Sequence, residues 1–390
     1  MTRWTRRNFL QTSGLGAAAF LLGCHNVQDS SQLTVPGYLG DYRDDYELDP
    51  RQAALSWFMD ARFGLFIHYG LYSQLGAGEW VQYGQKIPVA EYEKLADTFT
   101  AEKFDANFIA QLAVDAGMKY INITTRHHDS FCLFRTKYTP FNTVETAAKR
   151  DLIAELAQAC DKHKLGFCLY YSHGRDWRHP HAPNNDLWGG AARPKYETPD
   201  PAYAYGQDHS LQKFVDFMYG QIEELLTQYG PIANIWLDGY GVPASRPERY
   251  PEWQLDKLYA HIRSLQAHCL ISSKWGYNGK EDFAAPEIHW LKKQPKQLEK
   301  ALALDKPIEI CTAIAGWGYH KKNDGKHGDA DKQLAKLAYA AKYDANLLLN
   351  IGPRPLGDID PQDITILRDI GKHLRDHGWP ESADWDGQTA

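Results

Sequence analysis

Short apolar runs alternate with amphipathic stretches along most of the chain. Between the runs, apolar side chains recur at helical spacing, for example over residues 211–226. The runs themselves are apolar at consecutive positions, which is typical of strands buried on both faces. Strict alternation of such strands with helices predicts a parallel sheet. Seven runs have this character: 63–70, 118–125, 165–172, 234–239, 268–274, 308–314 and 346–353.

A shorter run, "EIHWL" at 287–291, falls where an eighth strand is needed. Eight strand–helix units within one domain predict a (β/α)8 TIM barrel rather than an open doubly wound sheet. The sequence has no GxGxxG or GxxxxGK[ST] motif, which would favour the open sheet. A long loop at 178–206 follows the third strand, on the face where barrel enzymes build their sites.

The two ends of the chain differ from this pattern. Paired Arg6 and Arg7 precede a short apolar run that ends in "LLGC" at Cys24, so residues 1–24 resemble a twin-arginine export signal with a lipobox. We therefore expect Cys24 to be lipidated and the protein to reach the periplasm or outer membrane as a lipoprotein. Residues 25–49 are polar and aperiodic, which predicts a tether. The barrel is expected over residues 50–380, and 381–390 form a C-terminal tail.

Composition narrows the class of partner only slightly. Net charge is −6 and no basic run stands out, which argues against nucleic acid. The chain has 12 Trp and 23 Tyr, which suit either a large core or stacking on sugars, and composition does not choose between them. No CxxC motif occurs, so we expect buried thiols rather than a disulfide framework or a cysteine metal site.

Polar residues gather where the predicted strands end. Carboxyl ends of barrel strands build active sites. Adjacent His127 and His128 would point to opposite sides of a strand, and no HExxH or HxH motif accompanies them, so we expect no metal, although His68, His128 and Asp238 could assemble one. No GxSxG motif supports a serine nucleophile. The strand ends offer His68, His127, His128, Asp129, Tyr171, His173, Asp176, Asp238, Lys274, Glu287 and Trp317.

Two of these residues are carboxylates on different strands. Asp238 ends "NIWL", and Glu287 follows Pro286 among apolar residues that predict a partly desolvated carboxyl. Two carboxylates roughly 5–5.5 Å apart across a sugar act as nucleophile and acid/base in a retaining glycosidase. Taken alone, Asp238 also fits a plain Asp-Gly turn and Glu287 a surface glutamate.

The motifs of the chain resemble, in order and over about residues 50–380, those of glycoside hydrolase family 29, the α-L-fucosidases. They are "WFMDARFGLFIHYGLYS", "EW" at Glu79–Trp80, "TTRHHDSFCLF", "GFCLYYS", "QYGPIANIWLDG", "APE", "WGY" and "NLLLNIGPRPLGDID". The chain stops soon after the eighth barrel unit, so the C-terminal β-sandwich that many members carry is not expected.

The resemblance implies a retaining exo-glycosidase that removes terminal α-L-fucose from oligosaccharides or polysaccharides without metal or cofactor. It implies Asp238 as nucleophile and Glu287 as acid/base, with Glu309 as the alternative. Ser130 stands where the family usually has Gly, and Lys274 where many members have Arg. The residues implied to bind the sugar are His68, Glu79, Trp80, His127, His128, Tyr171, Lys274 and Trp317.

Two other functions fit the same residues. An α-L-galactosidase of the same mechanism differs by one substrate hydroxyl, which an apolar pocket rejects only weakly. A non-catalytic, fucose-binding lipoprotein is the alternative from another class, although it would have no need of both Asp238 and Glu287. Turnover of aryl fucosides and aryl galactosides separates the three functions.

Overall fold

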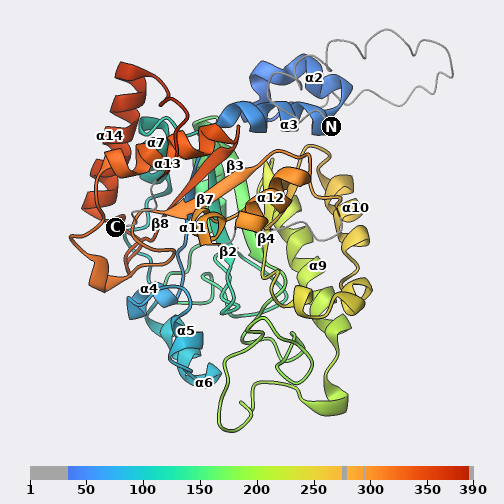
Figure 1. Ribbon diagram of the computed structural model, residues 1–390. Coiled ribbons are helices and arrows are strands. Elements are labelled where there is room, and N and C mark those ends of the chain that lie inside the picture. Colours follow the sequence, from blue (N-terminus) through green and yellow to red (C-terminus); the bar gives the residue numbers. More distant parts are fainter. Residues whose placement is uncertain (1–33, 275–278, 294, 386–390) are drawn as a thin grey trace, which may run out of the picture.

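The computed structural model describes residues 34–274, 279–293 and 295–385, which fold around one barrel of parallel strands (Figure 1). Each strand pairs in parallel with its neighbours in the order β6-β5-β4-β3-β2-β1-β8-β7. Parallel bridges from Ala284 to Ile308 and from Glu287 to Cys311 join β6 to β7 and close the barrel. The predicted (β/α)8 architecture is therefore confirmed. The strands are β1 (Phe63–Ile67), β2 (Tyr120–Arg126), β3 (Gly166–Ser172), β4 (Asn234–Asp238), β5 (Leu270–Ser273), β6 (Phe283–Ala284), β7 (Glu309–Ala313) and β8 (Asn346–Ile351).

Helices surround the barrel, and four of them follow an aspartate N-cap. Asp105, Asp151, Asp329 and Asp360 each accept a hydrogen bond from a backbone N–H of the first turn, which satisfies one otherwise unpaired donor. The outer helices are α7 (Ala106–Asp115), α8 (Leu152–Lys162), α9 (Leu211–Gln228), α10 (Leu255–Leu265), α11 (Ile288–Lys293), α12 (Pro295–Ala303), α13 (Ala330–Lys342) and α14 (Pro361–His377).

Short elements lie in the connections. After β1 come α4 (Tyr72–Leu75), α5 (Val81–Gly84), α6 (Val89–Tyr92) and the 3-10 helix η2 (Glu93–Thr98). The predicted long loop after β3 has neither helix nor strand until η3 (Gly206–Asp208). Further 3-10 turns in these connections are η4 (Pro243–Ser245), η5 (Pro247–Trp253) and η6 (Lys321–Asn323).

Successive residues of each strand face opposite sides of the barrel wall. On β3, Leu169 and Tyr171 pack into the apolar layer beneath the helices, whereas Cys168 and Tyr170 face the barrel interior. This period of two decides which strand residues reach a site at the mouth of the barrel.

The strand predicted at 287–291 is misplaced. The barrel strand in this part of the chain is β6 (Phe283–Ala284), and residues 288–291 instead begin helix α11. Pro286 has no N–H to continue the ladder. Ile288 and Leu291, three positions apart, are both buried, as one face of a helix requires.

The predicted tether is also shorter than expected. Residues within 25–49 form η1 (Gly37–Tyr42) and α2 (Arg43–Leu48), which precede α3 (Pro50–Ala61). Leu39 and Tyr46 are buried, and the Tyr46 hydroxyl lies 3.2 Å from His268 Nδ1, just before β5. These helices cover the end of the barrel opposite α4–α6 (Figure 1). Single, scattered apolar residues anchor these helices to the barrel, and such residues are a weaker sequence signal for a helix than a continuous apolar stripe.

The predicted chain ends fall largely outside the described residues. Arg6, Arg7 and Cys24 are among the residues not described. At the other end, Trp385 is buried and Ala383 N donates to Ala338 O, so the tail begins packed against α13. Among the described residues, no helix has the length and apolar character needed to cross a membrane.

Candidate active site

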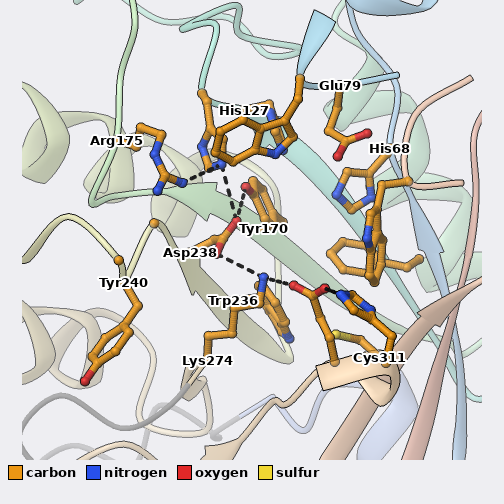
Figure 2. A pocket seen from close by; sticks show the side chains of 18 residues that line it. His68, Glu79, His127, Tyr170, Arg175, Trp236, Asp238, Tyr240, Lys274 and Cys311 are labelled. Atoms are coloured by element: carbon orange, nitrogen blue, oxygen red, sulfur yellow. Dashed lines mark hydrogen bonds and ion pairs between the residues drawn. The ribbon is translucent and has the colours of Figure 1, made fainter. Parts of the chain in front are cut away.

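A pocket of about 470 Å³ opens at the carboxyl ends of the barrel strands (Figure 2). It gathers most of the predicted site residues. Its polar and aromatic lining is Phe66, His68, Glu79, Trp80, His127, His128, Tyr170, Arg175, Trp236, Asp238, Tyr240, Lys274, Glu287, His289 and Trp317.

Two carboxylates meet at one ammonium in this pocket. Lys274 Nζ lies 3.6 Å from Asp238 Oδ1 and directly contacts Glu287 Oε1. The two carboxylate oxygens are therefore no more than about 6 Å apart, which fits the roughly 5–5.5 Å spacing of a retaining glycosidase rather than the wider inverting one.

Asp238 is held as an anion. Burial alone would raise the pKa of its carboxyl, but the Lys274 ammonium, together with other donors around the carboxyl, holds the pKa well below its usual value. The Tyr170 hydroxyl donates to Asp238 Oδ2 at 2.7 Å. On the backbone side, His173 N donates to Asp238 O at 3.1 Å, which fixes the end of β4 against β3.

Glu287 lies between β6 and α11 at the mouth of the same pocket. Its side chain is buried, as the apolar neighbours predict. Lys274 contacts one carboxylate oxygen, and His289 Nε2 lies 3.2 Å from the other. The acid predicted from "APE" therefore faces Asp238 across the pocket.

His68 presents an acceptor to the pocket. Its Nδ1 lies 2.7 Å from Asn350 Oδ1, and Asn350 Nδ2 donates to the carbonyls of Gly316 and Trp317, which fixes the amide orientation. Nδ1 of His68 must therefore be the donor, and Nε2 carries the lone pair. Burial lowers the pKa of this imidazole to about 3, so it is neutral.

The two adjacent histidines both line the pocket, contrary to the expectation that they point to opposite sides. Strand β2 ends at Arg126, so the alternation of a strand does not extend to His127 and His128. The His127 ring stacks on Tyr170 at 5.3 Å. Burial lowers the pKa of both imidazoles well below the usual value, so both are neutral.

His128 binds protein groups through both ring nitrogens. Ser172 Oγ donates to Arg175 O, so it must accept from His128 Nδ1 at 2.6 Å. Nε2 then accepts from the guanidinium of Arg175 at 3.0 Å. His128 therefore orients Arg175 rather than offering a free nitrogen to a sugar, which revises its predicted role.

Arg175 is a pocket residue that the sequence analysis did not single out. Its guanidinium lies over Trp80 at 4.9 Å and donates to the carbonyls of Gly190 and Ala191 in the long loop. The only signal was its position in "SHGRDW", between His173 and Asp176, directly after β3.

Two loops join across the pocket rim and carry its other predicted residues. Gly78 N donates to Tyr319 O, and Gly318 N donates to Glu79 Oε2 at 2.9 Å. Trp317, on the second loop, packs edge-on against Phe66 and at a tilt against His68. Burial raises the pKa of Glu79 above its usual value.

Tyr171 is not in the pocket, which corrects the prediction for that residue. Its hydroxyl donates to Gln221 Oε1 of α9, and its ring stacks against Arg126 at 4.4 Å. The adjacent Tyr170 takes the pocket position because it faces the barrel interior. The motif match located the strand correctly but placed the contact one residue too far along.

Other polar residues near the strand ends support the structure rather than line the pocket. Asp129 accepts from the Tyr92 hydroxyl at 2.7 Å. Asp176 forms a buried ion pair with Arg126. Glu309, the alternative acid/base, is fully buried in the barrel interior and does not line the pocket.

Three pocket residues have the spacing of metal ligands. Donor atoms of His127, His128 and Asp238 all lie within 4.8 Å of one another. However, His128 Nε2 already accepts from Arg175, and Lys274 lies beside Asp238. Two cations next to these atoms disfavour a divalent ion. A second group, Asp324, His327 and Asp360, meets the same criterion away from this pocket, where His327 pairs with Asp363.

Comparison with known proteins gives a consistent match. The family model described as Alpha-L-fucosidase matches residues 39–379. Human plasma alpha-L-fucosidase is 27% identical over 363 residues, which cover 85% of this chain and 69% of the human protein. Alpha-L-fucosidase isoenzyme 1 from Paenibacillus thiaminolyticus is 31% identical with a TM-score of 0.71, covering 86% of this chain and 80% of that one. Alpha-L-fucosidase AlfC from Lactobacillus casei, solved with alpha-L-fucose product, is 30% identical with a TM-score of 0.69, covering 83% and 99%.

Proposed function

Since the chain belongs to the alpha-L-fucosidase family, we propose that its barrel pocket binds a terminal alpha-L-fucose and hydrolyses its glycosidic bond with Asp238 and Glu287. The chain is a glycoside hydrolase of this family, and a retaining mechanism is consistent with it. The observation that carries the residue assignment is the single ammonium of Lys274 between the two carboxylates.

In the first step Asp238 attacks the anomeric carbon. The nucleophile must be ionised, and Lys274 and Tyr170 both stabilise its anion. The bond to the leaving oxygen breaks as the new ester bond forms, and Glu287 gives its proton to that oxygen. In the second step Glu287 takes a proton from water, whose oxygen displaces Asp238 and releases the sugar with its original configuration.

The other pocket residues suit a compact sugar. Trp80, Trp236 and Trp317 offer apolar ring faces, and imidazole and carboxylate groups offer acceptors for hydroxyl hydrogens. Neutral His68, with its lone pair on Nε2, is suited to accept from one sugar hydroxyl. Glu79 Oε2 already accepts from Gly318, so its orientation is fixed before the sugar binds.

Hydrolysis of aryl glycosides tests this function. We expect the wild-type protein to cleave 4-nitrophenyl alpha-L-fucoside, with the alpha anomer of fucose appearing first in ¹H NMR spectra. Faster cleavage of the aryl alpha-L-galactoside would reassign the substrate. Tight fucose binding with no turnover of either substrate would instead identify a binding protein.

We also propose that the protein is exported and anchored through a lipid on Cys24. The support is the paired Arg6 and Arg7, the short apolar run and the "LLGC" motif. Cys24→Ala should release the protein from the membrane fraction into the soluble periplasmic fraction. If Cys24→Ala fractionates with membranes as the wild type does, the lipid anchor is wrong.

A further inference from the structure

Glu309 is a buried carboxylate that the proposed catalytic steps do not use. It begins β7, its side chain faces the barrel interior, and it is 0% exposed. Its two oxygens accept hydrogen bonds from the Tyr120 hydroxyl at 2.6 Å and from Trp236 Nε1 at 2.9 Å. Among the described residues, no Lys, Arg or His forms an ion pair with it.

A carboxylate in this position costs stability. Burial raises the pKa of Glu309 to about 7, because only two neutral donors compensate the loss of water. An apolar side chain of similar volume would avoid that desolvation cost. Stability therefore does not explain an acid here, whereas its hydrogen bond to a pocket residue suggests a functional reason.

Trp236 connects Glu309 to the pocket. Its indole lines the pocket and stacks on the Tyr170 ring, with centroids 5.6 Å apart and an interplanar angle of 21°. Tyr170 in turn donates to Asp238 at 2.7 Å. Figure 2 shows Trp236, Tyr170 and Asp238 side by side in the pocket wall. The contacts therefore run from Glu309 through two aromatic rings to the proposed nucleophile.

We propose that Glu309 is a positioning residue: it fixes the plane of the Trp236 indole, which in turn keeps the Tyr170 hydroxyl directed at Asp238. The proposal rests on the proposed function of the pocket. It replaces the acid/base role that the sequence left open for Glu309. The indole has one donor, its N–H, and no acceptor. With the Glu309 carboxylate as a fixed acceptor, only one orientation of the ring keeps that N–H hydrogen-bonded.

The variants separate positioning from general packing. Glu309→Met removes the acceptor and leaves the indole N–H unsatisfied, so kcat/KM should fall on the order of tenfold through misplaced groups. Glu309→Gln keeps an acceptor for Trp236, while Tyr120 can rotate to accept from the new amide, so kcat/KM should stay within about threefold of wild type. Tyr120→Phe is the matched control, because it removes the other hydrogen bond of Glu309 without touching the pocket.

A double-mutant cycle with Trp236→Phe tests the connection. Once the indole N–H is gone, Glu309→Met should cause no further loss of kcat/KM. Additive losses, or a loss in Tyr120→Phe equal to that in Glu309→Met, would overturn the positioning role. If Glu309→Met does not fold, Glu309→Gln, Tyr120→Phe and Trp236→Phe still decide between the two outcomes.

A measurement that needs no turnover completes the test. The Trp236 indole N–H resonance, assigned as the peak missing from Trp236→Phe, should move upfield in Glu309→Met and remain near its place in Tyr120→Phe. An unmoved resonance in Glu309→Met would contradict the hydrogen bond itself. If wild type cleaves no fucoside but the resonance moves as expected, the proposed function fails and the Glu309–Trp236 contact stands.

Discussion

Lys274 helps to hold the proposed nucleophile Asp238 as an anion. Its ammonium contacts both Asp238 and Glu287. Burial would lower the pKa of Lys274, but the neighbouring Asp238 and Glu287 side chains raise it. A lysine here supplies a compact charge rather than the planar, bidentate fork of arginine. Both carboxylates therefore share one ammonium.

Removing that charge should move the pH profile. Lys274→Met leaves burial to raise the pKa of Asp238, so the nucleophile loses its proton only at higher pH. The acidic limb of kcat/KM should shift to higher pH, and kcat/KM at neutral pH should fall roughly 10²–10³-fold. A loss of activity with an unchanged acidic limb would contradict this electrostatic role.

The acid/base role of Glu287 should depend on the leaving group. Nitrophenolate departs without a proton, so Glu287→Ala should barely slow formation of the glycosyl-enzyme from an aryl fucoside. A sugar alkoxide needs the proton, so cleavage of a fucosyl oligosaccharide should fall roughly 10²–10⁴-fold. Rapid-quench kinetics on both substrates measure the difference, with Glu309→Gln as the control. If Glu309→Gln shows the leaving-group dependence and Glu287→Ala does not, Glu309 is the acid/base.

At the residue scale, the sequence indicated which residues could react or bind better than it indicated which side chains contact one another. Asp238, Glu287 and Lys274 were singled out because the carboxyl ends of barrel strands build active sites. Tyr170 was missed because the motif match did not show which of the two adjacent tyrosines of this strand faces the barrel interior. The partners of His128 were not predictable, because Ser172 and Arg175 come near it only through the packing of β2 against β3.

At the scale of elements, the loop after β2 contains a strained residue. Ser130 has a φ of 73°, a left-handed conformation that costs an L-residue about 1–2 kcal/mol. Its hydroxyl donates to Asp176 Oδ2 at 2.8 Å, a hydrogen bond to a charged group worth about 1.5–3 kcal/mol. The hydrogen bond therefore outweighs the strain that glycine would relieve.

Substitution of Ser130 should show this balance. Ser130→Ala loses the hydrogen bond and keeps the strain, so we expect it to lower the free energy of unfolding by about 2 kcal/mol. Ser130→Gly loses both the hydrogen bond and the backbone strain, so its free energy of unfolding should lie between those of Ser130→Ala and the wild type. Urea denaturation measures the order, and a glycine variant more stable than wild type would show that the strain dominates.

The elements that the sequence predicted best are those with long, continuous patterns. Seven strands were placed within a few residues, whereas the eighth was misplaced because a two-residue strand carries no periodic signal. Helices η1 and α2 were read as a tether because their few buried residues show no stripe. Both depend on packing against the barrel for their conformation.

At the scale of the whole molecule, the two ends of the barrel have separate roles. The described chain enters beside η1 and α2, which cover the end of the barrel where the strands start (Figure 1). The pocket lies at the other end, where the strands finish.

The buried histidines should make folding stability sensitive to acid. Each is neutral in the folded state but titrates near pH 6.5 when unfolded, so the unfolded chain binds more protons below that pH. Glu309 and Asp129, whose pKa values burial raises to about 7 and about 6, act in the opposite direction. Glu79, Asp363 and His327 also have a raised pKa, but these five groups are fewer than the eight histidines whose pKa is lowered. The histidines with lowered pKa are His68, His127, His128, His173, His179, His181, His268 and His320.

The free energy of unfolding should therefore fall as pH decreases from about 6.5 to 5. Each uncompensated proton contributes about 1.4 kcal/mol per pH unit, so the total change should be several kcal/mol. Urea denaturation at pH 7 and pH 5 measures it. A free energy of unfolding that is constant or rises over this range would contradict the neutral buried imidazoles.

The central claim is that Asp238 forms the covalent bond to fucose, and trapping tests it most directly. A 2-fluoro-fucosyl fluoride should inactivate the wild-type protein with one sugar per chain, because the fluorine at C2 slows hydrolysis of the intermediate. Peptide mapping by mass spectrometry should find that sugar on Asp238, and Asp238→Gly should not be labelled. A label on any other residue, or equal labelling of Asp238→Gly, would contradict the account.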